Sequence, residues 1–67
     1  MEQKTTLSKN EKIIVDTIIK YQALHIDALN QHVEIDFYTL LGLLTKLEME
    51  GIVSKNPGNI YKINTLT

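Results

Sequence analysis

The stretch EGIVSKNPGNIYKI, from Glu50 to Ile63, decides the fold. Two short apolar runs flank a turn in which Pro57 and Gly58 occupy the central positions of a type II geometry. Because a type II turn does not match the twist of paired strands, we expect a bulge or a slightly longer loop at this point. The stretch therefore predicts a β-hairpin with a lysine on each side of its turn.

Alternation along this hairpin predicts which side chains face the core. We expect four of them to point inward as two facing pairs, Ile52 with Ile63 and Ser54 with Tyr61. The outward face then consists of the intervening residues Val53, Lys55, Ile60 and Lys62. Its two lysines either bind a nucleic-acid backbone weakly or are ordinary charges that keep the domain soluble.

A first helix is predicted over the segment LSKNEKIIVDTIIKY, because Ser8 and Glu11 have the spacing of a capping box. On a 3.6-residue period one face of this helix carries Ile13, Ile14, Thr17, Ile18 and Tyr21. Val15 and Ile19 form a second apolar stripe. Either the domain covers this helix on two sides, or the second stripe contacts another domain or subunit.

Two further helices are predicted before the hairpin. A strand stub at Leu24–Ile26 leads to a brief helix from Ala28 to about His32, with Asp27 as its N-cap and Leu29 facing inward. Asp36 then caps a helix over 37–50, and Gly51 suits a left-handed C-cap. The buried stripe of that helix is expected to be Phe37, Leu40, Leu41, Leu44 and Leu47. Helix, strand stub, helix, helix and hairpin is the order of a winged helix, a mainly α fold of three helices plus a wing.

Length and composition place limits on the class of protein. The chain has 67 residues, no cysteine and 43% hydrophobic residues, which fits one small helical domain without disulfides or thiolate metal ligands. We expect a polar linker at 1–7, the winged helix at 8–64 and a tail at 65–67. A membrane-spanning run and a signal peptide are both missing from the sequence, so we expect a cytoplasmic location.

Catalysis is not expected. The two histidines, His25 and His32, lack a partner at the spacing of a metal site or of a general base. His25 is better explained by a hydrogen bond to a backbone group at the entrance of the short helix, and His32 as a solvated residue near its end. Because a glycine-rich phosphate loop is also missing, we predict no catalytic residue, metal, cofactor or small-molecule substrate.

DNA contact is the second possibility, because the second helix of a helix-turn-helix lies in the major groove. The outward face of the helix at 37–50 carries Tyr38, Gly42, Thr45, Lys46 and Met49. From 36 to 50, however, one lysine stands against three acids, a local charge of −2, and the whole chain has no arginine and a net charge of −1. Neutralisation of phosphates supplies much of the affinity of a protein for DNA. We therefore expect this acidic helix to bind DNA poorly. The candidate DNA contacts are Thr45, Lys46, Lys55 and Lys62, and the first helix adds Lys9, Lys12 and Lys20.

Protein docking is the third possibility. Tyr38, Gly42 and Met49 line one side of the same helix. A glycine inside an exposed helix costs roughly 0.5–1 kcal/mol relative to alanine, which favours a site where a partner approaches the backbone closely. Drift at an unconstrained surface position is the alternative.

Three motifs carry a family resemblance: LHIDAL before the short helix, LLGLLTKLEMEGIV after it, and the PGN-x-Y pattern of the wing. Together they make the chain resemble, from about Glu11 to Ile63, the C-terminal winged-helix domain of DNA-processing protein A (DprA, also called Smf). The resemblance implies a larger parent protein, in which a Rossmann-like core binds single-stranded DNA and helps to load the RecA recombinase during natural transformation.

An accessory function follows from that resemblance. The domain would add weak DNA contact or protein contact, with RecA or another protein as partner, while the parent core does the main DNA binding. We expect weak DNA binding by the isolated domain at physiological salt. The alternative is a small winged-helix transcriptional regulator, which would need to dimerise to read a palindromic duplex site.

Overall fold

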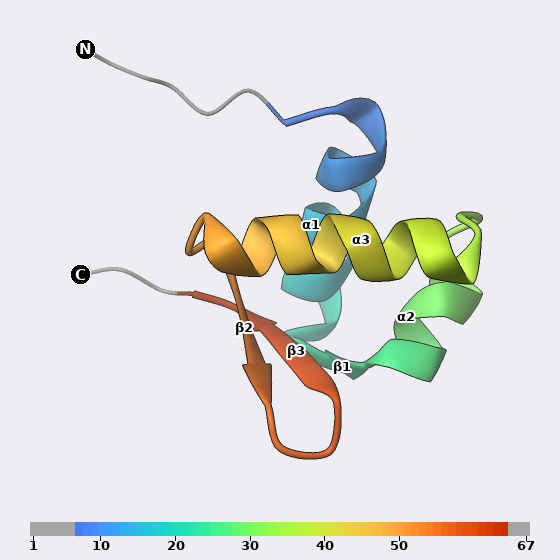
Figure 1. Cartoon of the computed structure of the whole chain (residues 1–67). Helices are drawn as coiled ribbons and strands as arrows, with labels where there is room; N and C mark the ends of the chain where they lie inside the picture. Colours follow the sequence, from blue (N-terminus) through green and yellow to red (C-terminus); the bar gives the residue numbers. More distant parts are fainter. Residues whose placement is uncertain (1–6, 65–67) are drawn as a thin grey trace, which may run out of the picture.

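The computed structural model describes residues 7–64, so the expected tail and all but the last residue of the expected linker lie outside the described part. The elements follow in the order α1 (Lys9–Tyr21), β1 (Ala23–His25), α2 (Ile26–His32), α3 (Phe37–Met49), β2 (Val53–Asn56) and β3 (Ile60–Ile63) (Figure 1). This is the predicted winged helix of three helices with a hairpin wing, to which the strand stub adds a third strand.

Helix α1 begins with the predicted capping box. The Ser8 N–H donates to Glu11 Oε1 over 2.8 Å, and the Glu11 N–H donates to Ser8 Oγ over 3.2 Å. Its buried face differs from the expected stripe, because Ile14 and Ile18 are fully buried whereas Ile13 and Tyr21 are exposed. The face turned to the core lies between the two predicted stripes, so Val15 is half-buried and Ile19 remains 57% exposed.

The predicted start of α2 was wrong by two residues. Its N-cap is His25, not Asp27: His25 has an extended backbone, and its Nδ1 accepts the Asp27 N–H over 3.1 Å. The strand stub accordingly runs one residue earlier than expected, over Ala23–His25. The hydrogen bond predicted for His25 at the helix entrance is confirmed, and Leu29 is fully buried as expected.

Helix α3 is capped at both ends as predicted. Asp36 Oδ2 accepts the N–H groups of Tyr38 and Thr39 at 3.1 and 3.3 Å. At the other end Gly51 takes φ +78°, the Gly51 N–H donates to the Glu48 carbonyl, and the Ile52 N–H donates to the Leu47 carbonyl, which together form a Schellman motif.

Only part of the stripe expected on α3 is buried. Its centre, formed by Leu40, Leu44 and Leu47, has no exposed surface. Leu41 is half-buried, and Phe37 is exposed because it stands in the first turn, at the margin of the core.

The predicted register of the wing was wrong by one residue. Val53 pairs with Ile63 and Lys55 with Tyr61, and β3 lies between β1 and β2 in an antiparallel sheet. The loop contains three residues, 57–59, which confirms the expected longer turn and closes on Asn59 with φ +60°. Ile52 is not a strand residue, because its N–H ends α3 through the Schellman motif.

This slip reverses the faces of β2 relative to the expectation. Val53 is 1% exposed and joins Tyr61 in the core, whereas Ser54 lies opposite Lys62 on the other face. Lys55 shares the face of Tyr61 and remains exposed beyond the edge of the core. The two wing lysines therefore lie on opposite faces of the sheet, not together on the outer one as predicted.

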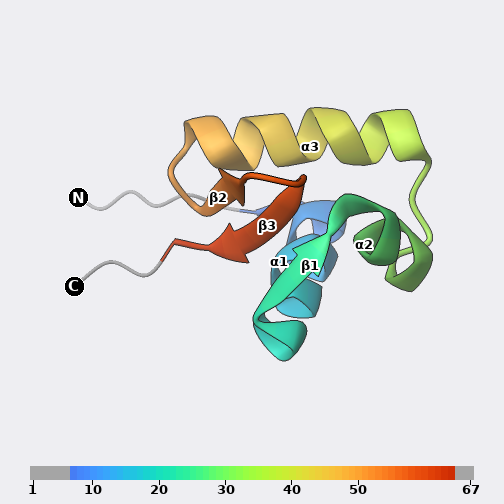
Figure 2. The same cartoon turned by 90° about the horizontal axis from the view of Figure 1, so that it is seen from below.

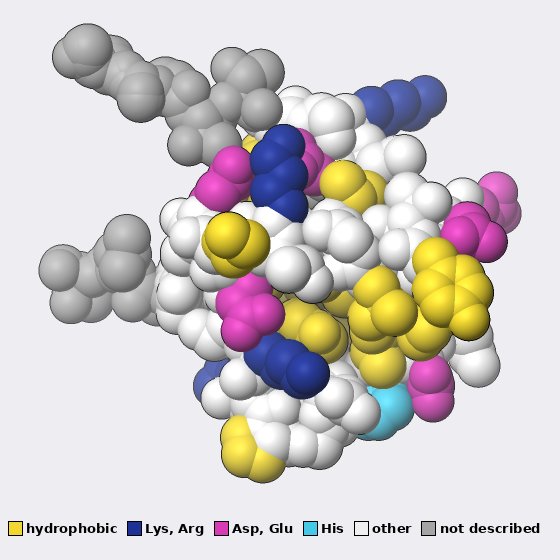
Figure 3. Space-filling view, viewed as in Figure 1, with side chains coloured by type: hydrophobic (Ala, Val, Ile, Leu, Met, Phe, Trp, Pro, Cys, Tyr) yellow, Lys and Arg dark blue, Asp and Glu magenta, His cyan; other side chains and the backbone are white. Residues whose placement is uncertain are grey.

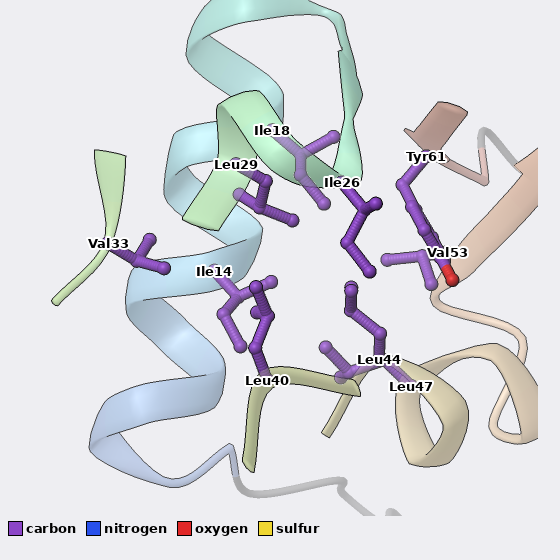
Figure 4. Close-up of a cluster of buried hydrophobic side chains, with 10 residues drawn as sticks. All are labelled: Ile14, Ile18, Ile26, Leu29, Val33, Leu40, Leu44, Leu47, Val53 and Tyr61. Carbon is purple, nitrogen blue, oxygen red and sulfur yellow. The ribbon is translucent and has the colours of Figure 1, made fainter. Parts of the chain in front are cut away.

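The core lies between α3 on one side and α1, α2 and the sheet on the other (Figure 2). Leu40 of α3 points toward Ile14 of α1 (Figure 4). Leu44 and Leu47 point toward Val53 and Tyr61, which close the cluster from the wing (Figure 4). The prediction that Tyr61 belongs to the core is confirmed, and Ile63 packs at its margin. Burial raises the pKa of the Tyr61 hydroxyl, and the carboxylate of Glu48 raises it further.

Candidate nucleic-acid interface

The outward face of α3 presents the residues that the sequence placed there. Tyr38 and Met49 are 80% and 83% exposed, and Gly42, Thr45 and Lys46 are exposed as well. Acidic, basic and hydrophobic side chains are interspersed on this face, and basic ones do not gather into a patch (Figure 3). The face therefore lacks the positive stripe by which a duplex reader holds phosphates.

Lys46, the one cation of α3, is engaged by a carboxylate of α1. Its Nζ lies 3.2 Å from Glu11 Oε2, and the Glu11 side chain is only 2% exposed. The Ser8 N–H bond is the strongest influence lowering the pKa of Glu11; burial raises that pKa, and the Lys46 ammonium lowers it again. Glu11 is thus held ionised, and Lys46 has a fixed partner within the domain instead of being free for phosphate.

Sequence reasoning missed this ion pair across helices. Glu11 precedes Ile14 and Ile18 by three and seven residues, so it stands on the buried stripe of α1. An acid in such a position signals an internal partner, because buried charges are paired. Which of the distant lysines pairs with it depends on how α3 crosses α1, and that cannot be predicted from local patterns.

The hydroxyl group of Thr45 already makes one hydrogen bond within α3. Its Oγ1 donates to the carbonyl of Leu41 over 2.9 Å, one turn earlier in α3. The hydroxyl can still accept a hydrogen bond, but its proton is used within the helix. Of the four candidate DNA contacts, Thr45 and Lys46 are therefore both engaged inside the domain.

The wing places its two candidate residues apart. Lys55 and Lys62 lie on opposite faces of the sheet, so they do not form one basic patch. The tip between the strands, 57–59, is uncharged, and the Ile26 N–H of α2 donates to the Asn59 carbonyl over 3.0 Å. The wing is thereby fixed to the rest of the domain, and each lysine offers a single phosphate contact.

Gly42 is not required by packing. A Cβ atom at this position would meet no described atom within 4 Å, and the backbone lies in a regular stretch of α3. The glycine leaves a bare patch of helix between Tyr38 and Met49. The open space around position 42 does not explain why glycine stands there. A docked partner and random sequence drift both agree with this geometry.

A stacked pair of rings was not foreseen from the sequence. Tyr21 and His32, the last residues of α1 and α2, have ring centroids 4.6 Å apart and ring planes 24° from parallel. Lys20 Nζ lies 5.4 Å from the centroid of the Tyr21 ring. The expected exposure of His32 is found, but its contact with Tyr21 depends on the angle between two helices and has no local signal.

Other kinds of site are scarce in the described part of the chain. Residues 7–64 contain no group of three or more histidine, cysteine or acidic side chains placed to hold a metal ion. Within the same range no helix combines the length and the apolar character needed to cross a membrane. One shallow hollow between α1 and β3 is lined by Ile19, Gln22, Lys62 and Ile63.

Comparison with protein families assigns most of the chain. A family model described as the DprA winged helix domain matches residues 2–59, which is most of the 67-residue chain. This range includes LHIDAL, LLGLLTKLEMEGIV and the PGN of the wing. Neither the curated proteins nor the solved structures contain a significant match to the chain.

Proposed function

Because this chain belongs to the DprA winged helix domain family, we propose that it is the accessory domain of a DprA-like DNA-processing protein that acts in natural transformation. In this role the DprA-like core binds incoming single-stranded DNA and loads RecA. The winged helix adds a weak DNA contact or a protein contact to that core activity. The family match supports the DNA-processing role, and the surface of the domain supports its auxiliary nature.

The observation that carries the proposal is the electrostatic character of α3. The segment 36–50 has three acids and one lysine, and that lysine already pairs with Glu11. A helix of this kind repels phosphates more than it attracts them. DNA contact is thus left to isolated lysines, Lys55 or Lys62 on the wing and those on α1, each of which contributes little alone.

Fluorescence anisotropy with a labelled random-sequence duplex tests this weak contact directly. At about 150 mM salt the 67-residue chain should bind with a dissociation constant weaker than micromolar, because few counterions are released. A tenfold lower salt concentration should tighten binding visibly. A sub-micromolar dissociation constant at the higher salt would contradict an auxiliary role.

Transformation frequency in the host tests the biological role. Removal of the codons for residues 8–64 should lower the yield of transformants while growth remains normal, because DNA processing is impaired and no housekeeping function is lost. The double variant Lys55→Gln, Lys62→Gln should lower it less. Normal transformation after complete removal would argue against the proposed pathway.

Protein contact through α3 is the second candidate, favoured by the exposure of Tyr38 and Met49 on either side of the bare backbone at Gly42. Gly42→Arg would fill this strip, whereas Gly42→Ala adds only a methyl group and serves as the control. Purified RecA and a DprA-like core are the partners to test by pull-down. Loss of binding in the arginine variant alone, with an unchanged circular dichroism spectrum, is the expected result. Equal binding by both variants would rule the strip out.

A transcriptional regulator would give different results in two measurements. Light scattering should show a dimer, and selection against random duplexes should enrich one palindrome. For the accessory domain we expect no enriched palindrome. A dimer with a single enriched site would replace the proposed function by this one.

A further inference from the structure

The ring pair Tyr21–His32 has the geometry of a stacking platform. The two rings lie nearly parallel at the ends of α1 and α2, Tyr21 is 42% exposed and His32 is exposed. Neither ring belongs to the core, and so the pair leaves aromatic surface facing solvent. A flat aromatic surface of this kind is what an unpaired nucleobase stacks on, whatever its identity.

A row of lysines leads to this platform. Lys9, Lys12, Asp16 and Lys20 are all exposed and recur at the spacing of one helical face. From Lys9 to Lys20 the row extends about 16 Å along α1, at a rise of 1.5 Å per residue. Three lysines against one aspartate give the row a charge of +2, opposite in sign to α3.

The single acid in this row does not neutralise it. Asp16 lies 3.8 Å from Lys12 Nζ, and both side chains are more than half exposed, at 61% and 72%. Exposed pairs of this type are weak and exchange readily with a phosphate. The other acid of α1, Glu11, is buried and paired with Lys46, so it contributes little to the charge of this surface.

We propose that these residues form a single-strand site, the α1 surface, made of Lys9, Lys12, Lys20, Tyr21 and His32. An unpaired base continues the Tyr21–His32 stack. Lys20, whose Nζ lies 5.4 Å from the centroid of the Tyr21 ring, turns toward the phosphate of that base, and the other lysines meet the neighbouring phosphates. A duplex is a poor ligand for this site, because its bases are stacked on each other and only their edges are accessible. The proposal rests on the proposed function for its choice of nucleic acid as the partner.

The α1 surface is separate from the face expected to read duplex DNA. Helix α3 runs along one side of the molecule, and α1, β1 and α2 lie on the other (Figure 2). Contacts at the two faces can therefore be distinguished by substitutions. The chain also provides a matched aromatic control, since Tyr38 is exposed at 80% but lies on α3.

Titration of the ¹⁵N-labelled chain with a twelve-residue thymidine oligonucleotide at about 50 mM salt tests the site, since binding of this kind weakens at higher salt. The amides of Tyr21 and His32 should shift, and Tyr21→Ala should weaken binding roughly fivefold to 100-fold, the usual range for loss of one stacked base. Tyr21→Phe should retain binding because the ring is kept. Tyr38→Ala should leave it unchanged.

Charge contacts are tested by the dependence of binding on salt. Lys20→Gln should reduce the slope of log K against log salt by roughly 0.7, the value for one phosphate contact on a single strand. Tyr38→Ala, which removes no charge, should leave that slope unchanged. Circular dichroism and a thermal melt of every variant show whether the fold is retained.

Three outcomes overturn the α1 surface. Equal weakening by Tyr21→Ala and Tyr38→Ala would show that no stacking site is present at α1. A dependence on Lys55 and Lys62 alone would leave the proposed function intact and remove this inference. If the oligonucleotide binds nowhere at millimolar concentration, the nucleic-acid assignment is wrong.

Discussion

Glu11 shows how one residue can join two helices of a very small domain. Its carboxylate accepts the Ser8 N–H with one oxygen and meets Lys46 with the other, so the start of α1 and the last turns of α3 are linked. The ion pair needs the ionised carboxylate, and the Ser8 N–H bond is stronger with it. The pKa of Glu11 is accordingly lowered below its ordinary value of 4.5.

Acid stability should report on this carboxylate. A lowered folded pKa means that the stabilisation is complete above the unfolded pKa near 4.5 and is lost as the pH falls through the folded value. Glu11→Gln should cost about 1–3 kcal/mol at pH 7 and flatten this acid limb, because the charged hydrogen bonds are weakened. Urea titrations at a series of pH values measure both effects. Glu34→Gln, at an exposed site, is the control, and an equal effect there would refute the assignment.

Gly42 offers a second test at the residue scale. Gly42→Ala should stabilise the domain by about 0.5–1 kcal/mol, because a Cβ atom meets no described neighbour and alanine loses less backbone entropy in a helix. For a domain of this size that corresponds to a melting temperature higher by roughly 2–8 °C. A lower melting temperature in calorimetry would mean that the bare backbone has a structural function.

Short sequence patterns predicted the roles of several of these residues correctly. They failed where a role depends on how distant elements pack. The capping box of Ser8 and Glu11, the Asp36 cap and the Gly51 end of α3 depend only on nearby backbone groups, so the sequence specifies them. His25 showed that a ring nitrogen can replace the carboxylate expected at an N-cap. The Glu11–Lys46 pair and the Tyr21–His32 stack depend on helix crossing, which no short window contains.

At the scale of the elements, the wing was predicted in kind but not in register. Its existence follows from turn chemistry, and so does a loop longer than two residues, which spans 57–59. The faces of β2 depend on whether the chain after α3 begins its strand at Ile52 or Val53. The Schellman motif uses the Ile52 N–H, which sets the first paired residue to Val53 and exchanges the two faces.

Two aspartate substitutions distinguish the two registers. Val53→Asp should destabilise the domain by about 3 kcal/mol or more, because it places an unpaired charge in the core. Ser54→Asp should be tolerated, since its neighbour across the strands is Lys62. Chemical denaturation of both variants measures the difference. The opposite order of stability would support the register with Ile52 and Ser54 inside.

The domain combines a winged-helix fold with an uneven distribution of charge. Helix α3 and its caps carry a net negative charge, whereas the exposed row on α1 is positive. The winged-helix class was predictable from the sequence because helix caps, apolar periods and turn residues agree with one another. The opposite net charges of α3 and of the row on α1 can be counted from the sequence as well. Whether each lysine is free or paired required the folded structure.

Mapping the amide shifts of the ¹⁵N-labelled chain on addition of a random duplex tests whether α3 reads DNA. We expect small, salt-sensitive shifts near the exposed lysines of α1 and the wing, with the amides of Tyr38–Met49 unchanged. Shifts concentrated on Tyr38–Met49, with saturation below micromolar at about 150 mM salt, would contradict this expectation.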